Sequence, residues 1–301
     1  MKKFLSVLMA GAMLFGVLTL AGCGDTTTDT GEDTTTTEDT TTTAEFTTVT
    51  EGVLTMSTNA AFPPYEMTDD SGNIVGIDAE IAAAIAEKLG LELEILDMDF
   101  DGALAAPQSG KSDIVMAGVT VNEERQLVLD FSNTYANGVQ KVIVAEGSDI
   151  TMENLGEQQI GTQKGTTGNI LTTDEFGEDH VIAYDDAIAA VQALNNGQID
   201  CVVIDSAVAD NLVEANPGLT TLDTDYANEE YAIGVAKGNT ALLDAINTAL
   251  QELIDDGTVQ SIIDKYIPTD GTAADEAGTT DEAGATDEAG ATDGAEADTA
   301  A

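Results

Sequence analysis

Beyond a short apolar run at the N-terminus (4–20), the large apolar residues of this chain are concentrated in one central stretch, from about residue 50 to residue 267. Residues 23–49 are mostly Thr, Asp and Glu, and residues 268–301 repeat an Asp-Glu-Ala-Gly-x-Thr unit without any large apolar side chain. With no apolar surface to bury, neither segment can offset the entropy lost on ordering. We therefore expect a disordered tether at 23–49 and a disordered acidic tail at 268–301. The folded part between them has roughly 220 residues, enough for two modest lobes.

The N-terminus has the pattern of an exported, lipid-modified protein. Lys2 and Lys3 precede an apolar run over 4–20, and small residues follow before Cys23. A basic start, a short apolar stretch and a small-residue cleavage site are typical of a secretory signal peptide. The sequence Leu-Ala-Gly-Cys resembles the bacterial lipobox, in which the Cys is diacylated, and stable anchoring needs more than one acyl chain. We expect a signal peptide at 1–22 and a lipoprotein anchored through Cys23 at the extracytoplasmic face of the cell membrane. An ordinary signal peptide with an incidental Cys is the alternative.

The net charge of −47 and the scarcity of Cys and His exclude several classes of function. Nucleic acid is excluded as a partner because phosphate binding needs clustered Lys and Arg. With Cys23 lipidated, Cys201 is unpaired within an apolar run and should behave as a small buried residue. The single histidine, His180, leaves little for a metal site or a His-based triad. We expect a monomer with no metal, no cofactor and no enzymatic activity.

Strand and helix periodicities alternate along the folded part. Strands are predicted at 53–57, 91–96, 113–117, 159–162, 200–204 and 230–235, and helices at 76–89, 101–109, 122–128, from 168, and at 185–195, 206–214, 240–255 and 259–266. Pro107 should end or kink the second helix. This alternation predicts an α/β fold with mainly parallel sheets flanked by helices. Ligands of such sheets bind beyond the carboxyl ends of the strands, in a cleft where two units face each other.

Two apolar segments can carry the chain between the lobes, one near 138–144 and the other near 229–235. If both cross, the first lobe is discontinuous, with residues 50–137 plus 233–267, and the second lobe is 138–232. Two crossovers of this kind permit hinge closure around a ligand.

A series of short motifs in a fixed order carries a family resemblance. The densest are Phe-Asp-Gly at 100–102, Gly-Lys-Ser-Asp-Ile at 110–114, Ala-Gly-Val-Thr-Val-Asn-Glu-Glu-Arg at 117–125 and Asp-Phe-Ser-Asn-Thr-Tyr at 130–135. Through them, residues 50–267 resemble the polar amino-acid-binding proteins of ABC transporters, the family-3 extracellular solute-binding proteins. The resemblance implies a two-lobed, periplasmic-binding-protein-like fold of type II. It also implies capture of an L-amino acid by closure of the lobes, like a Venus flytrap, and delivery to an ABC transporter permease.

Arg125 is the only arginine in the chain. A guanidinium can hold a carboxylate through two parallel hydrogen bonds, which Lys cannot do. The resemblance implies that Arg125 clamps the α-carboxylate of the ligand; pairing with neighbouring Glu residues at the surface is the alternative. Backbone N–H groups around Gly118 and Thr120, in the turn after a strand, can complete the carboxylate pocket.

The opposite lobe supplies two further groups to the same ligand. The turn at 164–168 holds Thr166 and Thr167, and the resemblance favours Thr167 for the carboxylate, although a helix cap is a compatible reading. Asp205 ends the apolar strand at 201–204, where the resemblance implies binding of the α-ammonium. Capping of the helix from Ser206 is the alternative for Asp205.

The ligand side chain meets a different set of residues. Phe62 and Phe100 match aromatic positions that sandwich it, with a core role as the alternative for Phe100. At Asn59 many relatives that bind glutamine or cationic amino acids carry Asp, and without that carboxylate a cationic side chain lacks its partner. Together with Gln163, Asn59 predicts a ligand with a polar, uncharged side chain.

Two other functions use the same fold. One is a dehydratase acting on prephenate-like acids, which needs a poised acid or base such as Asp205 or Glu66. The other is a ligand-sensing domain, which normally continues into a membrane helix where this chain continues into an acidic tail. The single His and the Arg125–Asp205 pair favour binding and transport over both.

Overall fold

The computed structural model describes residues 46–223 and 225–267. The signal peptide expected at 1–22, the lipidated Cys23, most of the tether and the acidic tail at 268–301 lie outside these residues. Contacts with the core begin before residue 50, because Phe46 packs against it and the amide of Val49 donates to Asp113 at 2.6 Å. The folded part therefore includes the last residues assigned to the tether. Within the described residues, no helix has the length and apolar character needed to cross a membrane.

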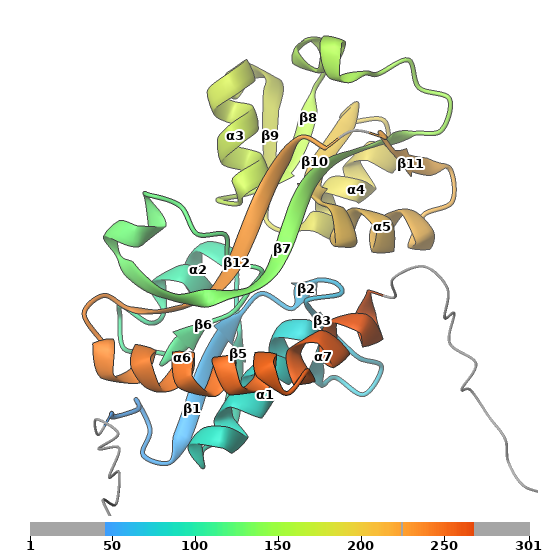
Figure 1. Cartoon of the computed structure of the whole chain (residues 1–301). Coiled ribbons are helices and arrows are strands. Elements are labelled where there is room, and N and C mark those ends of the chain that lie inside the picture. Colours follow the sequence, from blue (N-terminus) through green and yellow to red (C-terminus); the bar gives the residue numbers. More distant parts are fainter. Residues whose placement is uncertain (1–45, 224, 268–301) are drawn as a thin grey trace, which may run out of the picture. The chain divides into compact units, whose positions relative to one another are not determined.

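A mixed sheet of nine strands runs through the described part of the chain (Figure 1). Its order is β5-β1-β6-β12-β7-β10-β8-β9, with β11 paired to β7. The strands are β1 (Val53–Thr58), β5 (Glu92–Asp97), β6 (Ile114–Val115), β7 (Leu129–Ala145), β8 (Ile160–Gln163), β9 (Val181–Tyr184), β10 (Cys201–Asp205), β11 (Leu219–Thr221) and β12 (Ala227–Ala236). A small antiparallel sheet contains β2 (Ala61–Phe62), β3 (Glu66–Thr68) and β4 (Ile74–Val75).

Helices cover both ends of the large sheet. They are α1 (Ile77–Leu89), α2 (Phe100–Ala105), α3 (Thr167–Phe176), α4 (Ala187–Asn195), α5 (Ser206–Ala215), α6 (Thr240–Asp255) and α7 (Thr258–Tyr266). Helices α1, α2, α6 and α7 with strands β1 to β6 are here called the first half of the fold. Helices α3, α4 and α5 with strands β8 to β11 are the second half, as Figure 1 shows. Single 3₁₀ segments lie at Arg125–Leu127, Met152–Glu157 and Glu178–His180.

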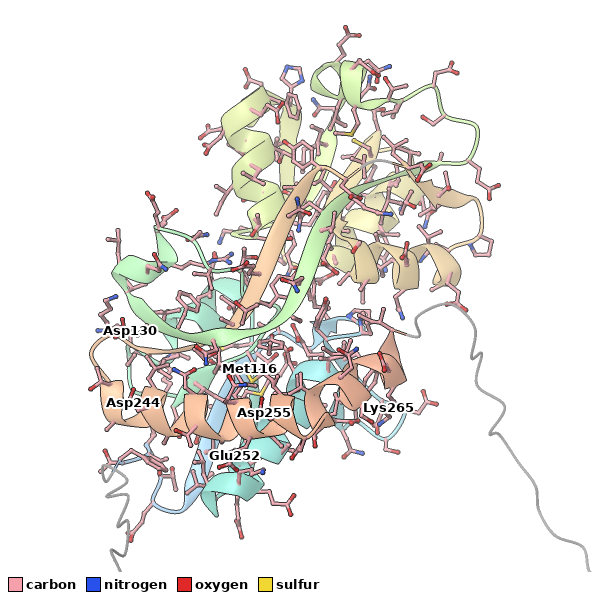
Figure 2. All side chains as sticks on the ribbon, in the orientation of Figure 1. Met116, Asp130, Asp244, Glu252, Asp255 and Lys265 are labelled. Carbon is pink, nitrogen blue, oxygen red and sulfur yellow. The ribbon has the colours of Figure 1, made fainter. Side chains whose placement is uncertain are left out.

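Helix α6 shows how the sequence places a helix on the sheet. Apolar residues recur on one face and are buried, namely Leu242, Ala245, Ile246, Ala249, Leu250 and Leu253. The acidic residues of the helix, Asp244, Glu252 and Asp255, are all exposed (Figure 2). This helical periodicity is what predicted α6 from the sequence.

Strands β7 and β12 connect the two halves. They pair antiparallel, from Leu129 opposite Ala236 to Gln140 opposite Ala227. On its other edge, β7 pairs with β10 of the second half, and β12 on its other edge pairs with β6 of the first half. The segments expected to cross, 138–144 and 229–235, lie within these two strands.

Several expectations from the sequence are confirmed and others are wrong. The α/β class is confirmed, and helix α2 ends at Ala105, before Pro107. A helix at 122–128 is wrong: this segment forms only the 3₁₀ turn, and Leu127 is 77% exposed, so no apolar face holds it against the core. Within each half the strands pair parallel, as expected: β5, β1 and β6 in the first half, and β10, β8 and β9 in the second. The sheet as a whole is mixed because the crossing strands β7 and β12 run antiparallel to each other, and β7 is also antiparallel to β10.

Two glycines at the ends of α1 offer a matched test of backbone geometry. Gly76 precedes the helix at φ 134°, and a Cβ there would lie 2.2 Å from the carbonyl oxygen of Tyr65. Gly90 ends the helix at φ 70° with no atom within 4 Å of such a Cβ. We expect Gly90→Ala to lower the free energy of unfolding by about 1 kcal/mol, the usual cost of the left-handed conformation. Gly76→Ala adds a backbone clash in a region that only glycine occupies and should cost at least about 3 kcal/mol.

Urea unfolding of both variants measures these two losses. Equal losses would show that the approach of Tyr65 to Gly76 does not matter for stability.

Candidate ligand-binding site

A cavity lies where the first and second halves of the fold face each other. Its lining residues come from both halves and from the two crossing strands: Asn59, Phe62, Glu66, Phe100, Ala117, Gly118, Thr120, Arg125, Gln140, Gln163, Thr166, Thr167, Ile204, Glu229 and Tyr231. Every residue predicted to bind ligand is among them except Asp205. The space between these side chains is about 20 Å³, room for about one water molecule. Side chains of the two halves therefore touch each other directly.

Arg125 reaches from the first half to the second. It starts the 3₁₀ turn, where its own amide donates to Asn122 at 2.8 Å. Its guanidinium donates to the carbonyl of Thr120 at 2.8 Å and, across the cavity, to the carbonyl of Gly165 at 3.1 Å. Burial lowers the pKa of the guanidinium from its usual value, and the nearby charge of Glu229 opposes that shift. Only 6% of the residue is exposed, which rules out the surface-arginine alternative.

The ring of Phe100 packs against the guanidinium of Arg125. The centre of its ring lies 5.3 Å from the guanidinium carbon, within the range of a cation–π contact. The same ring packs with Ala103, Val115 and Leu129 in a core cluster of the first half. Phe100 thus lines the cavity and belongs to the core. The core role considered for it is present, and its contact with a ligand side chain stays a prediction.

Hydroxyl groups meet across the cavity beside Arg125. Thr167, the first residue of α3, donates to the hydroxyl of Thr120 at 2.8 Å. Thr166 caps α3 by accepting from the amide of Asn169, and its hydroxyl donates to the carbonyl of Gln163 at 2.7 Å. Thr166, rather than Thr167, therefore has the capping role considered for this turn.

Gly118 shapes the wall of the cavity in a way the sequence did not reveal. Its amide donates at 2.9 Å to the buried carboxylate of Asp78. The sequence predicted that this N–H helps to bind the ligand carboxylate, but in the structure it is already used by Asp78. Gly118 has φ +54°, and a Cβ would lie 2.8 Å from the ring of Phe62, so the residue allows this aromatic ring to pack closely against the backbone.

The two amides expected to read the ligand side chain bind each other. The side-chain nitrogen of Gln163 donates to the amide oxygen of Asn59 at 2.9 Å. Asn59 in turn donates to the carbonyl of Met98 at 2.8 Å. The amide oxygen of Gln163 is buried and has no hydrogen-bond partner among the described residues.

Asp205 is fully buried at the carboxyl end of β10 but lies outside the cavity lining. One carboxylate oxygen accepts from the amides of Ala207 and Val208 and so caps α5. The other accepts from the hydroxyl of Tyr231 at 2.9 Å. The capping alternative is thus present in the structure. Desolvation is the main reason that the pKa of Asp205 rises to about 6.

Sequence reasoning missed several lining residues, among them Gln140, Glu229 and Tyr231. All three lie on the crossing strands β7 and β12. The one available signal was Glu229 next to Glu230 in an otherwise apolar strand pattern. Glu66 was considered only as an enzyme group. It is fully buried, and burial beside Asp78 raises its pKa well above the usual value.

The described residues give no sign of metal or thiol chemistry. Among them, no three His, Cys, Asp or Glu side chains lie close enough to hold a metal ion. Cys201 is buried in β10, where desolvation raises the pKa of its thiol to about 12. Such a thiol is unreactive, because the thiolate is the reactive form.

Comparison with protein families and with known sequences gives consistent matches. The sequence profile described as bacterial extracellular solute-binding proteins, family 3, matches residues 54–269. A probable histidine-binding protein of Neisseria gonorrhoeae is 29% identical over 282 residues, which are 91% of this chain and 98% of that protein. The L-cystine-binding protein TcyJ of Escherichia coli K12 is 31% identical over 225 residues, which are 73% of this chain and 85% of that protein.

Solved structures agree with the sequence matches. An ancestral arginine-binding protein bound to glutamine superposes with a TM-score of 0.70 and 39% identity, covering 73% of this chain and 100% of that one. A mutant of ArgBP from T. maritima superposes with a TM-score of 0.69 and 38% sequence identity, covering 72% of this chain and 96% of that one. These similarities confirm the periplasmic amino-acid-binding protein type of fold.

The buried carboxyl of Asp205 predicts a pH dependence of stability. Its pKa of about 6 in the folded protein lies above the usual value of 3.8. As the pH falls from 7 to 5, the folded protein takes up a proton that the unfolded chain does not yet bind, so the free energy of unfolding rises. Asp205→Asn keeps the cap acceptor without the charge. We expect it to raise stability at pH 7 by about 1–2 kcal/mol and to flatten the rise on acidification.

Urea unfolding at pH 7 and pH 5 measures both effects. Asp210→Asn, at an exposed acid on the same helix α5, is the control and should change stability by less than about 0.5 kcal/mol. An unchanged pH slope in Asp205→Asn would contradict the assignment.

Proposed function

The chain belongs to the family-3 bacterial extracellular solute-binding proteins, and from this premise we propose that it captures an L-amino acid with a polar, uncharged side chain by hinge closure. It is an amino-acid-binding protein of ABC import that acts outside the cytoplasm. The relatives carry the names of binding proteins and not of enzymes, as the prediction of a non-enzymatic protein requires. The dehydratase alternative therefore has no support.

The position of Arg125 carries the proposal. A buried guanidinium, stacked on Phe100, spans the cavity and donates to a backbone carbonyl of the opposite half. A ligand carboxylate is a stronger acceptor than a neutral carbonyl, because charge-assisted hydrogen bonds are shorter and stronger. Arg125 would exchange Gly165 for the carboxylate, and the hydroxyl of Thr167, which here donates to Thr120, would turn to the carboxylate and complete the pocket.

Two lobes would close on the ligand, with 50–137 plus 233–267 as one lobe and 138–232 as the other. Support comes from β7 and β12, which run from one half into the other with register shifts between Tyr231 and Gly234. Register shifts interrupt a ladder and let strands bend locally. Cleft contacts such as Thr167 to Thr120 and Gln163 to Asn59 would break on opening and reform around the ligand.

The ligand side chain would lie between Phe62 and Phe100, next to Asn59 and Gln163. These two amides are neutral, and the unpartnered oxygen of Gln163 can accept a hydrogen bond from the ligand. Relatives are named for arginine, histidine, cystine and glutamine. For this chain, an uncharged side chain that donates an N–H fits this end of the cavity.

Anchoring and delivery complete the proposal. Cys23 would hold the mature protein on the extracytoplasmic face of the membrane through its acyl chains, and the acidic tether would space the binding domain from the lipid. The partner would be an ABC transporter permease, and the protein would act as a monomer. Asp205, which accepts a hydrogen bond from Tyr231, would stabilise the ligand's ammonium group through its negative charge and without direct contact.

Calorimetric titration of the mature protein with the standard L-amino acids tests the function. We expect one or a few to bind, and Arg125→Lys to weaken binding by about a hundredfold because Lys keeps the charge but loses the fork. Lys164→Ala removes an exposed ion pair with Asp101 across the same cleft and should change affinity only a few fold. Full binding by Arg125→Lys would overturn the carboxylate clamp, and binding of no amino acid would overturn the function.

The predicted preference for an uncharged side chain is tested by Asn59→Asp. The new carboxylate faces the same end of the cavity and would supply the partner that a cationic side chain needs. We expect the affinity for L-arginine relative to L-glutamine to rise at least about tenfold. Asn73→Asp, in an exposed turn, is the control. A wild-type protein that prefers L-arginine, with no gain in Asn59→Asp, would contradict the specificity prediction.

A further inference from the structure

Glu229 places a carboxylate inside the cavity from a strand that connects the two halves. It lies on β12 opposite Gly138 of β7, is 5% exposed and lines the cavity. Its neighbour Glu230 points the other way and is exposed, as the alternation of a strand requires. An acidic side chain is rarely fully buried without a partner of opposite charge.

The hydrogen-bond partners of this carboxylate are neutral. One oxygen accepts from the hydroxyl of Thr120 and the other from the side-chain amide of Gln140. Among the described residues, no Lys or Arg forms an ion pair with Glu229. Arg125 is near enough to feel its charge, but it gives its hydrogen bonds to backbone carbonyls.

Two side chains that donate to Glu229, Gln140 and Thr120, also present oxygen atoms that can accept hydrogen bonds. The amide of Gln140 directs its nitrogen to Glu229, and its buried oxygen has no partner among the described residues. Thr120 gives its proton to Glu229, so its oxygen is left as an acceptor and receives the proton of Thr167. Buried acceptors without donors are costly. This end of the cavity therefore suits a group that brings several N–H donors and a positive charge.

We propose that Glu229, with the side chains of Gln140 and Thr120, forms the subsite for the ligand's ammonium group. The ammonium replaces the Thr167 hydroxyl as donor to Thr120 and gives a further hydrogen to the oxygen of Gln140. Its charge faces the carboxylate of Glu229, while Arg125 holds the ligand carboxylate. This assignment rests on the proposed amino-acid binding. It adds a negatively charged group, Glu229 on the crossing strand β12, to the residues proposed to bind the ligand.

The assignment is tested by a cycle of variants and ligands. The probes are L-glutamine, L-histidine and L-arginine, each compared with its analogue without the amino group, namely glutaramate, imidazolepropionate and guanidinovalerate. We expect Glu229→Gln to weaken binding of the amino acid about tenfold to a hundredfold, the range for a hydrogen bond to a charged group. The analogue should bind the wild type weakly and lose little more in Glu229→Gln, because it lacks the group that Glu229 faces. Glu230→Gln is the matched control on the same strand and should bind like the wild type.

A second variant guards against a purely structural effect. Gln140→Met removes the free acceptor from the other strand and should also weaken the amino acid more than the analogue. Thermal unfolding of each variant shows that it is folded. Equal losses for amino acid and analogue, or no loss in Glu229→Gln, overturn the subsite while leaving amino-acid binding intact. A wild-type protein that binds no amino acid overturns the proposed function and this subsite together.

Discussion

The antiparallel ladder between β7 and β12 is the constraint on which the rest of this structure depends. It is the longest strand pairing in the described residues, and on its other edge each strand pairs with a strand of a different half. Because the ladder passes beside the cavity, its side chains include Gln140, Glu229 and Tyr231, which line the site. The same two strands thus hold the halves together and supply part of the cavity lining.

The polar groups in the cavity offer the two opposite charges that the proposed amino-acid ligand needs. Arg125 presents a cation from the first half, and Glu229 presents an anion from the ladder. Behind Tyr231 a further buried acid, Asp205, is held by a helix cap, and Glu66 and Asp78 are fully buried close by. Burying acids is costly, and proteins commonly keep such costs at binding sites, where a ligand offsets them. The neutral contacts across the cleft are weaker than those a charged ligand can form.

The sequence predicted those elements whose pattern lies within the element itself, and it missed those that depend on residues far away in the chain. Helices α1, α6 and α7 carry an apolar stripe of their own, so periodicity found them. The site residues on the motif at 117–125 were found by resemblance, and the structure brings them to one cavity with Thr166, Thr167 and Gln163. Strand β7 was missed because its partners lie some ninety residues further along the chain, as Ala136 opposite Tyr231 shows. Glu229 and the bond from Gly118 to Asp78 were missed for the same reason, since both depend on contacts that no local pattern encodes.

Since Arg125 is the only arginine in 301 residues, a protease specific for arginine has a single bond to cut in the whole chain. That bond follows a side chain that is 6% exposed, in a turn held by Asn122 and by the carbonyls of Thr120 and Gly165. A protease needs this stretch extended and accessible, which the closed cleft does not allow. If the halves open and close as proposed, susceptibility to cleavage at this one residue would rise with the open fraction, and a ligand held by Arg125 would protect the bond that follows it.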